Sequence, residues 1–354
     1  MDEDHKNQNG IIIVGGYGHV GRQIAERLIE DERFFARIAG RNEAKANAAA
    51  KELGCTSVAL DLRDPHTWDA ALGEMKAAIV CVDQTDTQFV EYLLAKGLHY
   101  LDITADDAFF RKVEQLTPIA ETSGGKAVLS VGLAPGLTNL MVKACADKLD
   151  QPLNARIGIL LGLGDTHGPA AIDWTLRNFR PAKIDGMPFG NDKKPHPALP
   201  FDFADQHVLR RTLGISDIHT LLTFDSRILS RMLFRLLPLI TKHPALRRLV
   251  SKSMMYIRLG SDRAAVSVEV TGLRNKALVR QSMLLEGRQE AAITALVAAK
   301  TVPLLFEATV PAGVWHIDQV ASIDQYRHAL EAEGVSLSRS ENVRKDFGSP
   351  PSGQ

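Results

Sequence analysis

The stretch GIIIVGGYGHVGRQIAERL, which runs from Gly10 to Leu28, decides the fold of this chain. A β-branched apolar run precedes the glycines Gly16-x-Gly18-x-x-Gly21, and apolar residues then recur at helical spacing. This strand–turn–helix context is what the dinucleotide-binding fingerprint requires. The first glycine permits a tight turn, the second lets the backbone approach a pyrophosphate, and the third allows close helix–strand packing. The alternative is a plain strand–turn–helix connection that needs small residues.

The phosphate turn supplies most of the expected cofactor contacts. The helix that starts after the glycines presents free N–H groups and the positive end of its dipole to a pyrophosphate. His19 can touch a phosphate there or stand as an exposed loop histidine. The residues expected to bind the cofactor in this turn are Gly16, Tyr17, Gly18, His19, Val20 and Gly21.

The end of the second strand selects the dinucleotide. An NAD enzyme places an acid there to bind the ribose 2′-hydroxyl, whereas this chain has Ala39, Gly40 and Arg41. Arg41 can pair with a 2′-phosphate, so we expect NADP rather than NAD, although a solvated loop arginine is the alternative. Asp61 is expected near the adenine or as a helix-approach cap, and Asp83 is expected at the cofactor because it follows a strand.

Periodicity predicts an α/β fold with a Rossmann-type, doubly wound parallel sheet, followed by a second, mixed α+β domain. Asn42 is expected to cap a helix at 43–53, and Gly54 to end it. A further helix is expected around 106–122. The predicted strands of the first domain are 11–15, 33–40, 56–61, 76–82, 99–104 and 126–132.

The domain boundaries follow from changes in sequence texture. After residue 147, a strand at 154–164, a helix at 168–179, a loop-like segment at 181–205 and an antiparallel pair turning near Asn275 are expected. The predicted division is a Rossmann domain at 1–147, a substrate-binding or dimerisation domain at 148–287, C-terminal helices at 288–335 that return to the Rossmann domain, and a disordered tail at 336–354.

Composition limits the possible partners. Lys plus Arg and Asp plus Glu both number 42, so the formal net charge is zero, and we expect no nucleic-acid or membrane partner. The three cysteines form no C-x-x-C motif, which argues against a metal site and fits a reducing cytoplasm. The opening MDEDHKNQNG lacks the features of a secretory signal. The stretch Ile228–Val250 is interpreted as amphipathic helices that cover a core or a subunit partner, and a membrane-surface helix is the alternative.

Two residues are candidates for catalysis. Asp102 ends a predicted strand, where ligands of open α/β sheets bind, and it can shuttle a proton or hold a substrate ammonium. Its alternative role is a helix cap or a buried hydrogen-bonding group. His167, in the polar break GLGDTHG, is a candidate general acid toward a developing amine, and a glycine-rich turn capped by Asp165 is the alternative.

Four segments resemble the saccharopine dehydrogenase (saccharopine reductase) family: GGYGHVGRQIA, AGRNEAKANAAAKEL, LAKGLHYLDIT and VLSVGLAPGLTNL. The resemblance covers residues 10–145. It implies an NADP-binding Rossmann domain, a second domain that binds a small-molecule substrate and forms a homodimer, and chemistry on an amino-acid imine. The family's loop usually has Asp before Pro-Gly, where this chain has Ala134.

The predicted function is an NAD(P)-dependent oxidoreductase that acts on a C–N bond of an amino acid or polyamine. The loss of the loop acid keeps open a non-catalytic NADP(H)-binding sensor. The apolar stretch Ile228–Val250 keeps open an enoyl or lipid-type reductase. Fold by itself does not separate these alternatives.

Overall fold

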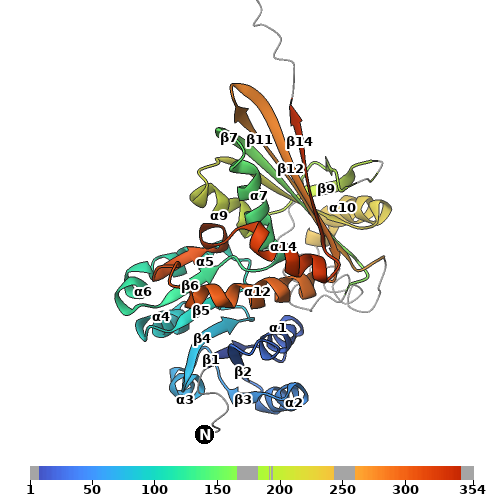
Figure 1. Cartoon of the computed structure of the whole chain (residues 1–354). Coiled ribbons are helices and arrows are strands. Elements are labelled where there is room, and N and C mark those ends of the chain that lie inside the picture. The colour runs from blue at the N-terminus through green and yellow to red at the C-terminus, as the bar shows by residue number, and fades with distance from the viewer. Residues whose placement is uncertain (1–7, 166–181, 191, 193, 243–259, 344–354) are drawn as a thin grey trace, which may run out of the picture. The chain divides into compact units, whose positions relative to one another are not determined.

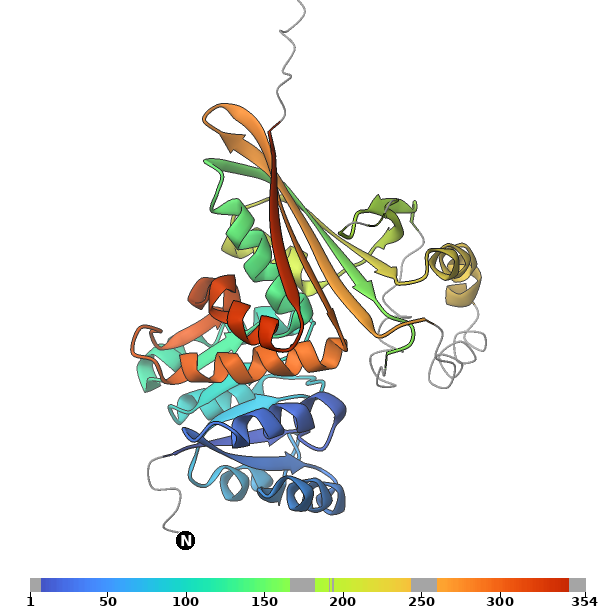
Figure 2. The same ribbon diagram turned by 45° about the vertical axis from the view of Figure 1, so that its right-hand side comes forward.

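The computed structural model describes residues 8–165, 182–190, 192, 194–242 and 260–343. The chain divides into two compact units (Figures 1 and 2). Unit 1 comprises residues 1–139, 203–208 and 289–330, and unit 2 comprises 140–202, 209–288 and 331–354.

Unit 1 contains a sheet of seven parallel strands in the order β13-β6-β5-β4-β1-β2-β3. The predicted doubly wound parallel sheet is therefore confirmed, with one strand more than expected, since β13 pairs with β6 at the edge. The strands are β1 Asn9–Val14, β2 Phe34–Gly40, β3 Thr56–Ala59, β4 Met75–Val80, β5 His99–Asp102, β6 Lys126–Leu129 and β13 Gly313–His316.

The helices of the N-terminal region begin and end close to the predicted boundaries. Asn42 caps α2 by accepting a hydrogen bond from the Lys45 N–H at 3.0 Å, and Gly54 ends it in the left-handed conformation, as predicted. The single helix predicted at 106–122 is two helices, and Pro118 stands in the first turn of the second. The helices are α1 His19–Ile29, α2 Glu43–Leu53, α3 Trp68–Leu72, α4 Gln88–Ala95, α5 Asp107–Glu114, α6 Thr117–Ser123 and α7 Thr138–Ala146.

Residues 289–330 lie in unit 1. Helix α12 packs against α1, and β13 extends the sheet. The elements are α12 Glu290–Phe306, the short α13 Ile317–Val320 and α14 Ile323–Ala332.

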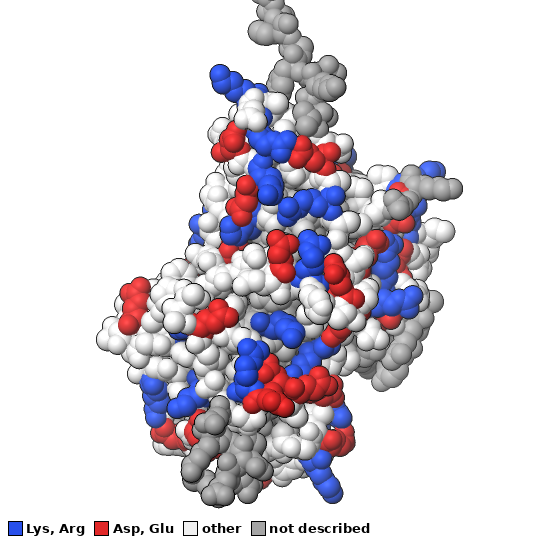
Figure 3. Space-filling view, in the orientation of Figure 1, with Lys and Arg blue, Asp and Glu red and all other residues white. Residues whose placement is uncertain are grey.

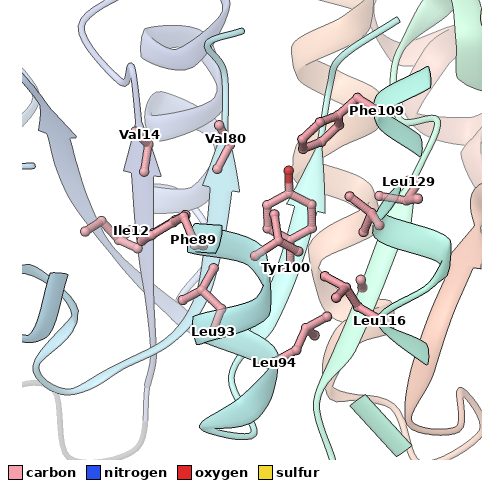
Figure 4. Close-up of a cluster of buried hydrophobic side chains, with 14 of the residues drawn as sticks. Ile12, Val14, Val80, Phe89, Leu93, Leu94, Tyr100, Phe109, Leu116 and Leu129 are labelled. Atoms are coloured by element: carbon pink, nitrogen blue, oxygen red, sulfur yellow. The ribbon is translucent and has the colours of Figure 1, made fainter. Parts of the chain in front are cut away.

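A buried apolar cluster fixes one face of the parallel sheet (Figure 4). Ile12 and Val14 belong to this cluster with side chains of α3 to α6, so the alternating Ile11 and Ile13 point to the opposite face. Tyr100 lies among these side chains, and Figure 4 shows its hydroxyl oxygen directed toward the ends at which the strand arrows finish. Burial on both faces explains why the central strand β1 is apolar from Ile11 to Val14.

Unit 2 contains a mixed sheet in the order β14-β12-β11-β7-β10-β9-β8, in which β7 and β10 are parallel. The predicted antiparallel pair is confirmed as the hairpin β11–β12, where Asn275 and Lys276 adopt positive φ at the turn. The strands are β7 Gln151–Leu161, β8 Asp185–Met187, β9 His196–Pro200, β10 Asp217–Phe224, β11 Arg263–Arg274, β12 Ala277–Arg288 and β14 Ser336–Val343. Helix α10 is Arg227–Lys242, and the residues of α9 Ala204–Thr212 are divided between the two units.

Two predictions for this part of the chain are wrong. The segment 181–205 is not a loop throughout, because it contains β8 and β9. The tail predicted to be disordered from residue 336 begins with β14, which pairs with β12 over Ser336–Val343. An edge strand is held by backbone hydrogen bonds and needs no apolar periodicity, so the polar sequence concealed it. The helix predicted at 168–179 lies outside the described residues.

The surface carries both signs of charge. Figure 3 shows Lys and Arg interspersed with Asp and Glu over the face in view, in keeping with the formal net charge of zero. Within the described part of the chain, no helix has both the length and the apolar character needed to cross a bilayer.

Candidate cofactor and active site

The turn between β1 and α1 is built around a glycine outside the predicted triplet. Gly15 has a φ of +80°, and its N–H donates to the Ala39 carbonyl at 2.8 Å. A Cβ on Gly15 would lie 2.6 Å from the Cγ1 of Val82. The tight turn that was expected of Gly16 therefore takes its positive φ at Gly15, which the sequence signals only through the doubled glycine. A Cβ on Gly16 would still meet the Ile13 carbonyl at 2.8 Å.

The other two glycines lie at the start of α1. Gly18 precedes α1 in an extended conformation and provides no side-chain cap, so the first N–H groups of the helix remain available to a ligand. A Cβ on Gly21 would lie 2.6 Å from the Gly15 carbonyl oxygen, and the absence of that atom lets α1 pack against the turn. His19 is exposed and Val20 half-buried at the start of the helix.

A pocket opens beside this turn at the carboxyl ends of β1, β2, β3 and β4. The sheet order reverses between β1 and β4, which is the switch point at which open α/β sheets bind ligands. Tyr17 lies against Gly40, where a Cβ would be 2.4 Å from the ring. The lining residues are Val14, Gly15, Tyr17, Gly40, Arg41, Leu60, Asp61, Leu62, Arg63, Val82, Asp83, Gln84, Thr85, Asp86 and Phe89.

The predicted residues Tyr17, Arg41, Asp61 and Asp83 thus meet in one pocket. The wall also includes residues that were not predicted as cofactor contacts, among them Leu62, Arg63 and Thr85. Their signal in the sequence is position alone, since they directly follow strands that the sheet order brings together.

One side of the pocket, which we call the rim, consists of Arg41, Asp61 and Arg63. Arg41 is exposed and directly follows β2. The Asp61 carboxylate accepts the backbone N–H of Arg63 at 3.0 Å and lies 3.5 Å from its guanidinium. The bond from the Arg63 backbone lowers the pKa of Asp61, and the charge of Arg41 contributes weakly in the same direction. The next helical turn is capped by Asp64 rather than by Asp61.

A second group, which we call the buried network, consists of Tyr100, Asp102 and Gln84. Asp102 ends β5 and is only 1% exposed. The Tyr100 hydroxyl donates to its carboxylate, and the Thr104 N–H donates to the second oxygen. The Gln84 side-chain NH₂ donates to the Tyr100 oxygen at 2.6 Å and to Asp102 at 3.3 Å. The Oε1 atom of Gln84 is buried and has no hydrogen-bond partner.

Burial sets the protonation of this carboxyl group. It raises the pKa of Asp102 from its ordinary value of 3.8 to about 7, against the hydrogen bonds from Tyr100 and Thr104, which lower it. The carboxylates of Asp83 and Asp106 add a smaller upward shift. Asp106 caps α5, so the cap suggested for Asp102 is provided elsewhere. Burial also raises the pKa of the neighbouring Cys81 thiol, which argues against a nucleophilic thiolate.

A separate buried chain of polar groups ties β13 to the sheet. The Ser130 hydroxyl lies 2.7 Å from Nδ1 of His316, and Nε2 of His316 lies 2.9 Å from the Glu114 carboxylate. Ser130 and His316 are both buried, so these contacts join β6, β13 and α5. Sequence reasoning missed this connection because the partners are far apart in the chain.

The loop after β6 is also held from within unit 1. The Gly136 N–H donates to the Asn139 side chain at 3.2 Å. The same side chain donates to Asp318 at 3.3 Å, and the Leu133 N–H donates to the Thr294 hydroxyl. The other catalytic candidate, His167, lies outside the described residues and stays a prediction.

Fold and pocket together define a class of protein, the Rossmann domains that bind a dinucleotide at the switch point of the sheet. Residues 11–128 match the family model described as the saccharopine dehydrogenase NADP binding domain. The pocket, the open start of α1 and the absence of side chains at Gly15 and Gly18 fit a nicotinamide dinucleotide.

Solved structures share the fold. Apo histidine-tagged saccharopine dehydrogenase (L-Glu forming) from Saccharomyces cerevisiae superposes with a TM-score of 0.63 at 13% identity, over 94% of this chain and 100% of that one. The C. glutamicum DAP dehydrogenase in complex with DAP superposes with a TM-score of 0.50 at 14% identity, over 89% and 94%. At identities this low, the superpositions show a shared fold.

Among curated proteins, prestalk A differentiation protein A of Dictyostelium discoideum is 35% identical over 63 residues. The matched segment is 18% of this chain and 21% of that protein, so the likeness covers about a fifth of either length.

Proposed function

We propose that this chain is an NADP-dependent oxidoreductase that acts on a C–N bond, the imine or secondary amine of an amino acid or polyamine. The observation that carries the proposal is one pocket at the switch point, with Arg41 where an NAD enzyme has an acid. The expected relation to saccharopine dehydrogenase supports the amino-acid substrate class. Unit 2 would bind the substrate and form the homodimer.

The cofactor is assigned to named groups of unit 1. The N–H groups at the start of α1 would bind the pyrophosphate, because a helix N-terminus carries unpaired donors and a positive dipole end. Arg41 would meet the 2′-phosphate through charge-assisted hydrogen bonds. When bound, the nicotinamide supplies or accepts a hydride, which is the redox half of the reaction.

The residue of the chain that would transfer a proton in this reaction is Asp102. A carboxyl group with a pKa of about 7 is partly protonated near neutral pH, so it can donate a proton to an imine nitrogen and recover it afterwards. The Tyr100 hydroxyl and the Gln84 amide hold this carboxyl group in one orientation. His167 is a second candidate acid.

The test is an assay of NADPH oxidation with purified protein and a panel of amines paired with 2-oxo acids. Turnover with any pair, lost in Asp102→Asn while NADPH still binds, supports the proposal. Turnover that needs no amine would contradict the C–N assignment.

A non-catalytic NADP(H) sensor is the second candidate, and Ala134 is the observation in its favour. The family's loop usually has an acid at this position, and this chain has none there. Tight NADPH binding without turnover across the whole panel would support the sensor.

A further inference from the structure

Helix α10 in unit 2 exposes a row of large apolar side chains. Ile228, Met232 and Leu236 are 72%, 56% and 50% exposed, and their spacing of four residues places them on one face of the helix. The opposite face carries the buried Phe234 and Leu237. The expectation that this helix covers a core is therefore met by one face only.

The exposed face is also basic. Arg231 and Arg235 are exposed and alternate with the apolar row at helical spacing. Helix α10 contains four Lys and Arg residues, at 227, 231, 235 and 242, and no Asp or Glu. The sequence has no acidic residue between Asp225 and Asp262. A chain with zero net charge thus concentrates positive charge on one amphipathic helix. Figures 1 and 2 show this helix at the edge of unit 2 beside β9.

We propose that this face of α10 docks on an anionic lipid surface, with the helix lying in the plane of the interface. Exposed Ile, Met and Leu side chains can enter the boundary between headgroups and acyl chains, while arginines extend their guanidinium groups to lipid phosphates. Each Lys or Arg near an anionic surface adds to the attraction, and salt weakens it. The inference is independent of the proposed enzymatic function.

Charge decides between a lipid surface and a second copy of the chain. If two α10 helices packed face to face, Arg231 and Arg235 would meet arginines and no acidic partner from α10. Like charges across an interface oppose association, whereas an anionic membrane is complementary to this face. The zero net charge predicted no membrane partner, but binding to an anionic surface depends on the local distribution of charge and not on the total.

The experiment is flotation of the full chain with phosphatidylcholine vesicles, with and without phosphatidylserine. We expect binding to the anionic vesicles only, and at least about a tenfold loss of binding when the salt concentration rises from 0.05 to 0.5 M. The double variant Arg231→Glu/Arg235→Glu should lose at least about tenfold, and Met232→Asn should bind more weakly than the wild type. Lys112→Glu and Leu153→Asn, at exposed sites on other elements, are the matched controls and should bind as the wild type does.

Three results would overturn the proposal. The first is no binding to anionic vesicles at low salt, and the second is equal binding to neutral vesicles. The third is self-association in size-exclusion chromatography that the arginine variants abolish without any vesicle binding, which would assign the face to a second copy. Thermal unfolding of each variant checks that it is folded. The arginine double variant and Met232→Asn must both bind anionic vesicles more weakly than the wild type.

Discussion

The rim and the buried network lie at the same edge of one parallel sheet but follow opposite electrostatic rules. Arg41 in the rim is exposed, so its charge is permanent and screened by solvent. Asp102 in the buried network is 1% exposed, and burial raises its pKa to about 7. The rim offers a fixed charge to a ligand, whereas the buried network offers a proton that is exchanged near neutral pH.

Under the proposed function, this difference would separate cofactor binding at the rim from proton transfer at Asp102. Interactions at the rim should respond to salt and hardly to pH, because guanidinium groups stay protonated. Interactions of the buried network should respond to pH and little to salt, because a desolvated group is weakly screened. The following predictions test that division, from the largest expected effect to the smallest.

Removing the cofactor from the site should have the largest effect. Gly18→Val puts a side chain where the pyrophosphate must approach, at a φ of −75° that valine tolerates. We expect NADPH binding to weaken more than about a hundredfold in fluorescence titration, with little change in melting temperature. In Gly21→Ala, by contrast, the new Cβ would lie 2.6 Å from the Gly15 carbonyl oxygen, so stability should fall first. A folded Gly18→Val with normal affinity would show that the turn is structural only.

Asp102→Asn should lower kcat by about 10²- to 10³-fold and leave the Kd of NADPH within about threefold, because it removes the proton and not the binding site. In the wild type, kcat/KM for imine reduction should fall as pH rises through about 7, where Asp102 loses its proton. Asp106→Asn is the control, since asparagine also caps helices. An unchanged pH profile in Asp102→Asn would exclude Asp102 as the titrating group.

The raised pKa of Asp102 also makes the stability of the wild type depend on pH. The folded chain holds a proton on Asp102 between its ordinary pKa of 3.8 and about 7, and the unfolded chain does not. The contribution of Asp102 to the free energy of unfolding is therefore lost as pH rises through this window. Chemical denaturation at pH 5 and pH 8 should show that Asp102→Asn removes this decline.

Arg41→Ala should weaken NADP binding by about ten- to a hundredfold, which is ~1.4–2.8 kcal/mol, and change NAD binding by less than about threefold. The reason is that only NADP carries the 2′-phosphate that Arg41 would meet. Raising salt should weaken NADP binding in the wild type and have less effect in the variant. Arg63→Ala, whose arginine already pairs with Asp61, should cost less. Equal losses of affinity for NADP and NAD would contradict the assignment of Arg41 to the 2′-phosphate.

The smallest effect is expected from Tyr100→Phe. The Tyr100 hydroxyl donates to Asp102 and lowers its pKa, so its removal should move the inflection of kcat/KM to higher pH. Tyr92→Phe is the matched control, because Tyr92 donates to the exposed carboxylate of Asp69 on α3. A shift to lower pH in Tyr100→Phe would contradict the origin that we give to the pKa of Asp102.

Much of unit 1 could be predicted because its signals are local. The β-branched runs of a parallel sheet, the cap at Asn42 and the stop at Gly54 depend on residues within a few positions of one another. Strand ends of a doubly wound sheet converge by topology, so Arg41, Asp61 and Asp83 could be placed at a common pocket. In unit 2, β14 and β9 escaped prediction because pairing with distant strands defines them.

The sequence by itself determined the parallel sheet, the phosphate turn and the arginine at the end of β2, because backbone sterics and hydrophobic period act over short stretches. Only the tertiary structure decided that Gly15 takes the positive φ, that Tyr100 and Gln84 enclose Asp102, and that one face of α10 stays exposed. These properties depend on burial, and burial is set by neighbours that the fold brings from far along the chain.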